Sequence, residues 1–207
     1  MKKLYYIPIV HNQADLGSSV SQLSLEGENK YGKDAWQNHI REVDISWNNL
    51  ESEINSRIKV SFDKIKIYQD GLPVVGEIGM KIIKDSVSKG SINYKIIENL
   101  INNGSKIELA ENKDLLIKEY NLISDITKAE TIEDKLKAYA MYQMVSDELL
   151  DDRDKFISNQ INTTLDEVGV AFFGAAHSII DKLDSDIEVI IINMFTDEIS
   201  LKLITKK

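Results

Sequence analysis

The sequence predicts an α/β fold in which a central, mostly parallel sheet is flanked by helices. Short runs of β-branched and aromatic residues alternate along the chain with longer segments of helical periodicity. Strands that alternate with helices build parallel sheets, because each parallel connection needs a crossover that a helix can supply. A chain of 207 residues fits one such domain (1–207), with a helical middle segment at about 75–165 and a β-rich C-terminus.

The predicted strands are compact apolar runs that end in turn-forming or polar residues. The first run contains Pro8, which lacks a backbone donor and therefore indicates an edge position or an irregular strand end. The second run ends at Asp70-Gly71, with Pro73 close behind, which is a firm stop for a strand. The last two runs suggest an antiparallel hairpin at the edge of the sheet. Strands are expected at 4–10, 65–68, 106–110, 168–173, 187–193 and 199–204.

Helices are predicted where apolar residues recur every three or four positions, in several cases after a capping residue. Residues 12–32 are polar, rich in Ser, Gly and Asn and without a period, so we expect a long loop there. The helix expected next carries Trp36 and Trp47 on its apolar face, which makes that face a candidate interface between copies of the chain. Helices are expected at 33–57, at 75–88, after caps at Ser91 and Asn112, and from Thr131 to about 165 with a bend near 150–152.

Composition argues against several classes of function. The chain has 34 acidic and 25 basic side chains and a formal net charge of −9, which repels phosphate backbones and disfavours nucleic-acid binding. No apolar run reaches the roughly 20 residues that a membrane-spanning helix needs, so no membrane partner is expected. The chain has no cysteine, which removes disulfides, thiolate metal sites and cysteine nucleophiles. A cytoplasmic location is the default expectation.

Two of the three histidines, His11 and His177, follow predicted strands. His177 comes after Gly174-Ala175-Ala176, whose small side chains let the backbone approach a neighbouring group closely. Open α/β sheets bind ligands at the carboxyl ends of their strands, and imidazole serves both as a general base and as a metal ligand. The two rings could therefore share one metal ion or substrate; the alternative is that each only satisfies a hydrogen bond of its loop. His39 differs, since it is expected on a helix at the surface or half-buried.

Asp70, Glu111 and Arg153 are the other candidate site residues. Asp70 ends a strand and could bind metal or fix an imidazole tautomer, although Asp before Gly is also common in turns without chemistry. Glu111 follows another strand, and its alternative role is that of a charged residue in the first turn of a helix. Arg153 is either an inward-facing guanidinium that binds a carboxylate or phosphate, or part of a solvated helix face, which its three acidic neighbours favour.

The segment from Arg153 through Gly174-Ala175-Ala176-His177 resembles the C-terminal motif region of the TraB/Tiki superfamily, which also includes erythromycin-esterase-like and ChaN-like proteins. That pattern is an arginine-bearing helix, a strand and then Gly-x-x-His. The superfamily carries an earlier Gly-x-x-His after its first strand, where this chain has Pro8-Ile9-Val10-His11, so the histidine matches and the glycine does not. A carboxylate that follows a later strand in the family would correspond to Asp70 or Glu111.

Over nearly its full length the chain is also similar to an uncharacterised group of bacterial and archaeal proteins, which brings no known activity. The segments that carry this likeness are Ile9-Val10-His11, 67–73, Lys89-Gly90-Ser91 and the Gly-Ala-Ala-His motif.

The residues and the resemblance together predict a metal-dependent hydrolase of a small molecule or peptide. Its divalent metal would be Mn²⁺, Zn²⁺ or Co²⁺, with His11, His177, Asp70 and Glu111 as candidate ligands. The histidines, Asp70 and Arg153 would carry the catalysis, and one histidine acting as a base without metal is a variant. Two alternatives stay open. One is a non-enzymatic protein that binds haem or another small ligand, as the resemblance to ChaN-like proteins implies. The other is an interaction protein whose apolar helix faces build a homo-oligomer.

Overall fold

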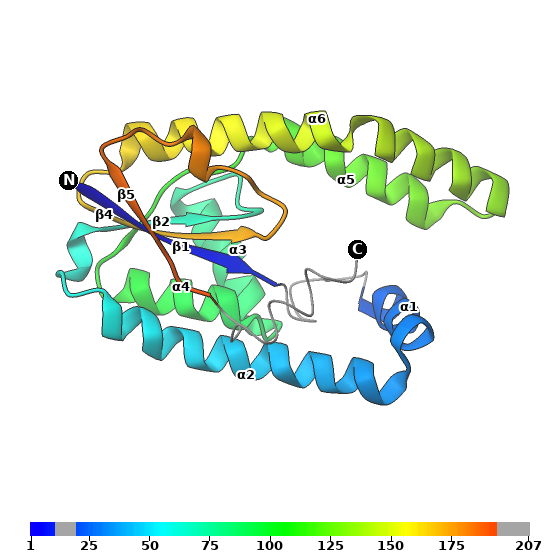
Figure 1. Cartoon of the computed structure of the whole chain (residues 1–207), viewed down its shortest axis with the longest axis horizontal. Helices are drawn as coiled ribbons and strands as arrows, with labels where there is room; N and C mark the ends of the chain where they lie inside the picture. The colour runs from blue at the N-terminus through cyan, green and yellow to red at the C-terminus, as the bar shows by residue number, and fades with distance from the viewer. Residues whose placement is uncertain (11–19, 194–207) are drawn as a thin grey trace.

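The centre of the molecule is a five-stranded sheet in which every strand is parallel to its neighbours. The computed structural model describes residues 1–10 and 20–193, and Figure 1 shows the sheet in the middle of the fold. This arrangement confirms the predicted α/β class. The strand order is β3-β2-β4-β1-β5, with the strands at β1 (Lys2–Ile9), β2 (Ile65–Gln69), β3 (Lys106–Ile107), β4 (Val168–Gly174) and β5 (Ile187–Ile191).

Helices cover both faces of this sheet, and each face has its own apolar core. In Figure 1, α2 and α4 lie below the sheet, while α5 and α6 lie above it. The lower core joins strand residues such as Ile67 to Trp47 and Ile97, whereas the upper core joins Phe173 to Ile157. The helices are α1 (Val20–Tyr31), α2 (Lys33–Arg57), α3 (Gly76–Ser88), α4 (Ile92–Asn102), α5 (Lys113–Lys128) and α6 (Ile132–Thr164).

Strand β4 is the most deeply buried strand, and its sequence explains why. Six of its seven residues are buried, and only Gly174 at its end is partly exposed. A strand that is covered on both faces reads as a continuous apolar run without alternation. Because β4 lies between β1 and β2, it fixes the position of whatever follows its carboxyl end.

The loop predicted for 12–32 is wrong over its second part, where the chain forms helix α1. The helix packs against α2 through Gly27, because a Cβ atom at this position would overlap the ring of Trp36. A glycine and several polar residues hide this helix from a periodicity argument, and its contact with α2 is a tertiary effect. Residues 11–19 lie outside the described part of the chain.

The candidate interface at Trp36 and Trp47 cannot include Trp47. Trp47 is fully buried in the core, and its indole N–H donates to the carbonyl of Val10 at 3.0 Å. Trp36 is occupied by its contact with Gly27 of α1. The apolar face of α2 therefore packs within the molecule, as most amphipathic helices of globular proteins do.

Smaller differences concern the strands and helix ends. Strand β1 is central, so the edge position predicted from Pro8 is wrong; however, Pro8 lies past Tyr6, the last residue in register with β5. Strand β5 is parallel to β1, and the run at 199–204 lies outside the described residues. Helix α6 is continuous through 150–152, where a bend was expected.

Helices α5 and α6 form an antiparallel hairpin whose outer end extends well beyond the carboxyl ends of the strands (Figure 1). Here this hairpin is called the arm. Among the described helices, none is both long enough and apolar enough to cross a membrane.

Candidate functional site

The candidate site lies where the chain leaves the sheet in two opposite directions. After β2 the chain proceeds to β3 on one side, and after β4 it proceeds to β5 on the other side. The carboxyl ends of β2 and β4 therefore form a topological switch point, which is where open α/β sheets bind ligands. Asp70 directly follows β2, and its backbone N–H donates to the carbonyl of Phe172 in β4 at 2.9 Å. His177 follows β4 after a short turn, in which its N–H donates to the Gly174 carbonyl.

Arg153 of α6 is buried and binds three carboxylates from different parts of the chain. It holds Glu111 with two bonds, from Nε to Oε2 at 3.2 Å and from Nη2 to Oε1 at 2.5 Å. Nη2 also donates to Asp70 Oδ1 at 2.8 Å, and Nη1 donates to Glu119 Oε2 at 2.6 Å. The solvated helix face that the neighbouring charges favoured is therefore wrong. Position 153 follows Leu149 by one helical turn on the buried side of α6, where the guanidinium must find partners inside the protein.

The imidazole of His177 is held by a second buried carboxylate, Asp154. The Nδ1 atom lies 2.6 Å from Asp154 Oδ1, and the other oxygen of Asp154 accepts the N–H of Ser178 at 2.7 Å. The edge of the ring meets Phe173, with centroids 5.5 Å apart. This grip leaves Nε2 directed toward Asp70, whose Oδ2 lies 3.5 Å away.

Gly174 lets the carboxylate of Asp70 come close to the end of β4. The glycine N–H donates to Asp70 Oδ2 at 2.9 Å. A Cβ atom at this position would lie 3.2 Å from the same oxygen, which is tighter than ordinary packing allows. The expectation that the small residues before His177 mark a close approach is thus confirmed at Gly174.

The two buried carboxyl groups, Asp70 and Glu111, respond to this environment in opposite ways. Burial alone would raise the pKa of Asp70, but hydrogen bonds and charges from His177 and Arg153 hold it well below its usual range. For Glu111, which has essentially no exposed surface, burial raises the pKa to about 7 against the opposing effect of Arg153, and the charge of Asp70 adds to the rise. Of these two carboxyl groups, Glu111 is therefore the one that takes up a proton more readily.

The surroundings of His177 raise the pKa of its ring and so favour the charged form. Burial by itself would lower the pKa of His177, but the hydrogen bonds from Asp154 and Asp70, together with the charge of Asp70, raise it to about 9. In the metal-free protein the ring is consequently protonated at neutral pH. The nearby Tyr6 has its pKa raised to about 12 by burial first and then by the charges of Asp154 and Asp70.

Asp70, Glu111 and His177 form one potential metal-binding group in the described part of the chain. One ligand atom from each residue lies within 4.8 Å of the others. Two carboxylates and one imidazole are ligands that Zn²⁺ and Mn²⁺ both accept. Asp154 supplies the carboxylate that commonly holds the other nitrogen of a metal-binding histidine. The donor set and its support thus fit a divalent ion.

The group opens into a cleft of about 520 Å³. Asp70, Arg153 and His177 line it together with residues of β1, the arm and the turn after β4, whereas Glu111 lies behind them. The residues that complete the lining are Ile9, Val10, Glu119, Tyr142, Ser146, Asp147, Leu150, Gly174, Ala175 and Ala176. A small molecule that enters this cleft reaches the Asp70–His177 pair directly.

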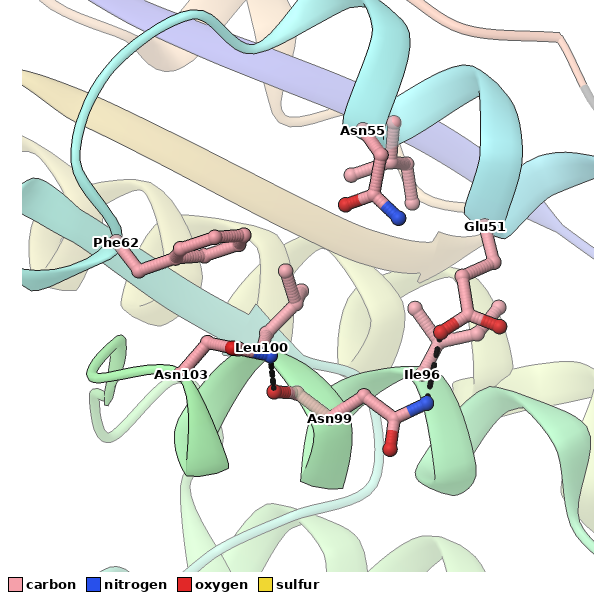
Figure 2. A pocket seen from close by; sticks show the side chains of 8 residues that line it. Glu51, Asn55, Phe62, Ile96, Asn99, Leu100 and Asn103 are labelled. Atoms are coloured by element: carbon pink, nitrogen blue, oxygen red, sulfur yellow. Dashed lines mark hydrogen bonds between the residues drawn. The ribbon is translucent and has the colours of Figure 1, made fainter.

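A second hollow at the amino ends of the strands offers a contrast. It lies between the ends of α2 and α4, near Phe62, and Figure 2 shows the side chains that line it. Asn99 donates to the carboxylate of Glu51 at 2.7 Å, and Asn103 donates to the carbonyl of Asn99. The remaining lining is amide and apolar, so Glu51 is the one titratable side chain of this hollow and has no second such group beside it for acid–base or metal chemistry.

The structure brings together four of the five predicted site residues: Asp70, Glu111, Arg153 and His177. The fifth, His11, lies outside the described residues, so its sharing of the site stays a prediction; its neighbour Val10 lines the cleft. The turn role for Asp70 and the helix-start role for Glu111 do not account for their buried contacts with Arg153. His39 is half-buried on α2, against the ring of Trp36, and is not among the residues that line the cleft.

Sequence reasoning missed Asp154 and Glu119. Both interrupt apolar stripes at helical spacing: Asp154 falls between Leu150 and Ile157, and Glu119 between Leu115 and Leu122. An acidic residue on the inward face of a helix needs a buried partner, so this spacing was the available signal.

Comparisons of the chain with protein-family models, with curated proteins and with solved structures find no match in any of the three.

Proposed function

We propose that this protein is a metal-dependent hydrolase whose site lies at the carboxyl ends of β2 and β4. Asp70 and His177 are the ligands that face the cleft, and Glu111 is the third ligand behind them. The observation that carries the proposal is the pairing of His177 with the buried Asp154. This pairing fixes the ring and leaves Nε2 beside the carboxylate of Asp70, as a metal-binding histidine requires.

A divalent ion bound there would lower the pKa of a water molecule and polarise a carbonyl group, which is the chemistry of metal-assisted hydrolysis. Charge supports such an ion. Four carboxyl groups, those of Asp70, Glu111, Glu119 and Asp154, surround two cationic side chains, so the site favours an additional positive charge.

In this proposal Arg153 holds metal ligands in place and also keeps one donor for the substrate. A guanidinium has five N–H groups, and four of them are engaged with Glu111, Asp70 and Glu119. Arg153 therefore holds two of the metal ligands in place. Because it lines the cleft, its remaining N–H is available to a substrate oxygen that gains negative charge.

The proposal is tested by titrating chelator-treated protein with Mn²⁺ and with Zn²⁺ in a calorimeter. We expect one tightly bound ion per chain. The variants Asp70→Asn and His177→Gln should each weaken binding at least about tenfold, and His39→Gln serves as the matched control. Hydrolysis of p-nitrophenyl acetate and of a fluorogenic peptide is then measured with and without the bound ion.

Metal binding that is equally tight in the two site variants would overturn the ligand assignment. Hydrolysis that persists unchanged after chelation would overturn the metal dependence. A titration with haemin provides the remaining contrast, because an absorption band that depends on His177 would favour the ligand-binding alternative over hydrolysis.

A further inference from the structure

The part of the cleft wall that the arm supplies carries negative charge beyond what the proposed metal site uses. Glu119 and Asp147 both line the cleft, and neither belongs to the potential metal-binding group. Asp147 is exposed and forms no ion pair with any other described residue. Glu119 gives its Oε2 atom to Arg153 at 2.6 Å, while its Oε1 accepts no hydrogen bond from the described residues. Both carboxylates are thus available to a ligand that enters the cleft.

A bound metal ion would not remove this excess of negative charge. Asp147 is the fifth carboxyl group in or directly behind the cleft. These five groups would face one guanidinium and one divalent ion, because His177 is neutral when it binds a metal. A negatively charged cleft with low-dielectric walls attracts cations and repels anions. The cleft therefore disfavours substrates that carry a carboxylate or a phosphate and favours those that carry a positive charge.

An aromatic ring lies beside the two carboxylates of the arm. Tyr142 is half-buried and lines the cleft. Burial and then the charge of Glu119 raise the pKa of Tyr142, and the charge of Asp147 adds to the rise, so the phenol lies near both carboxylates. A protonated amine is stabilised by carboxylates and also by the face of an aromatic ring. The combination indicates a place for an ammonium group.

This place lies close to the potential metal ligands, because Arg153 joins the two. Its Nη2 donates to Asp70 Oδ1 at 2.8 Å, and its Nη1 donates to Glu119 Oε2 at 2.6 Å. Two hydrogen bonds and the width of one guanidinium separate these carboxylate oxygens by at most about 8 Å. In an α-amino acyl group the nitrogen and the carbonyl oxygen are about 3 Å apart. Such a group spans the distance when its amine binds Glu119 and its carbonyl meets the Asp70–His177 pair.

The cleft also offers apolar contacts to the side chain of an amino acid. Ile9 and Val10 of β1 and the residue that follows it, together with Leu150 of α6, are part of the lining. A branched aliphatic side chain would leave water on contact with them. The cleft volume of about 520 Å³ lies within the range of small-ligand sites, so one aminoacyl residue and its leaving group fit.

We propose that the substrate is a short peptide or amide with a free amino terminus and an apolar first residue. The protonated amine lies against Glu119, Tyr142 and Asp147, while the first carbonyl group reaches Asp70 and His177. This inference rests on the proposed hydrolase function. The reaction joins the oxygen of water to the acyl carbon and breaks the bond between that carbon and the amide nitrogen. One proton of the water goes to the departing nitrogen, and the products are an amino acid and an amine.

Binding is tested first, without metal and therefore without turnover. Chelator-treated protein is titrated at pH 6.5 with L-leucinamide and with N-acetyl-L-leucinamide in a calorimeter. The two ligands share a side chain, but the first carries a protonated amine at this pH and the second carries no charge. We expect L-leucinamide to bind at least about tenfold more tightly, because hydrogen bonds to charged groups are the strong ones.

The variants Asp147→Asn and Glu119→Gln should each lose most of this preference, since each removes one negative charge with little change in shape. Asp147 makes no contact with Arg153, so its variant keeps the test valid if Glu119→Gln disturbs the buried cluster. Glu148→Gln is the matched control. Glu148 is the next residue of α6, is exposed and does not line the cleft, so its variant should keep the full preference.

Turnover is tested second, with L-leucine p-nitroanilide and its N-acetyl derivative on the metal-loaded protein. We expect kcat/KM to be at least about tenfold higher for the free amine, and this ratio should fall in Asp147→Asn but not in Glu148→Gln. Equal binding of the two amides, or a preference that falls equally in the control variant, would overturn the ammonium site. Faster turnover of the acetylated substrate would also overturn it. A charge-dependent preference in binding without hydrolysis of either anilide or of p-nitrophenyl acetate would support the ammonium site and contradict the hydrolase function.

Discussion

At the scale of single residues, the site is a cluster of buried charges that depend on one another. Arg153 is surrounded by Asp70, Glu111 and Glu119, and His177 is held between Asp154 and Asp70. A buried charge is costly unless a partner of opposite sign compensates for it. Removal of either cation would therefore leave carboxylates that repel one another. Such a cluster is retained for the geometry that it enforces more than for stability.

Protonation of His177 gives the unfolding free energy a defined pH dependence. The folded-state pKa is about 9, above the usual 6.5, so the stabilisation is fully present below pH 6.5 and is lost as the pH rises to about 9. Glu111, with its pKa raised to about 7, acts in the same direction at lower pH. We expect the metal-free protein to lose on the order of 2–3 kcal/mol between pH 6.5 and 9. Urea unfolding in the presence of a chelator measures this loss.

The variant His177→Gln isolates the histidine contribution. Its unfolding free energy should change much less over the same pH interval, while His39→Gln should behave like the wild type. If His177→Gln retains the full slope, then a different group titrates and the assigned direction for His177 is incorrect.

The sequence identified those site residues that follow strands, since the carboxyl ends of parallel strands meet at one edge of the sheet. Asp70 and His177 were found by this argument, and Glu111 came from the strand before α5. Asp154 and Glu119 were missed because they lie within helices, where a charged residue is ordinarily assumed to face solvent. Their partners, Arg153 and His177, lie far away in the sequence, so a local pattern cannot predict these pairs.

At the scale of elements, α6 is one continuous helix in two different environments. From Leu149 to Ile161 it buries one face against the sheet, whereas from Ile132 to residue 148 none of its described residues is buried. Helices of this kind owe most of their stability to tertiary packing and little to intrinsic propensity. The helix continues without a break through 150–152, because acidic residues on its more exposed side do not interrupt the backbone hydrogen bonds. The periodicity of the sequence predicted the helix, but it could not show that the contact between α6 and the sheet begins only at Leu149.

Hydrogen exchange should divide α6 near Leu149. Amides between Leu149 and Ile161 are expected to exchange on the order of 100-fold more slowly than amides between 136 and 145, because the outer segment can open without disturbing a core. Mass spectrometry of peptides from each segment provides the measurement. Uniform protection along the whole helix would show that the arm is covered in solution.

At the scale of the whole molecule, the formal charge of −9 sets the response to salt. Repulsion among surface carboxylates opposes the compact state, and dissolved ions screen this repulsion. The parallel sheet itself followed from the alternation of strands and helices. Its strand order did not, since the order depends on which strands pack together across long stretches of sequence. For the same reason α1 went unrecognised, because its packing partner, Trp36, lies on another helix.

We expect the unfolding free energy at pH 7.5 to rise by on the order of 1 kcal/mol when NaCl is increased from a low concentration to about 0.4 M. At this concentration the Debye length is about 5 Å, so repulsion between surface charges is largely screened. Urea unfolding at several salt concentrations gives the value. Near pH 5, where protonation lowers the negative charge, the same increase in salt should have a smaller effect. A salt response that is equal at both pH values would contradict the repulsion argument.

The position of β1 has a consequence for the order in which the protein can be built on the ribosome. Among the described strands, β1 is made before all the others, yet both of its neighbours, β4 and β5, are made after all the others. The nascent chain must therefore carry an unpaired apolar strand until β4 has left the exit tunnel, about 160 residues later. Completion of the sheet and assembly of the charged site then occur together, once β4 and β5 have been made. Contacts that are so distant in sequence make folding slow, and they make the newly made N-terminal strand a target for chaperones.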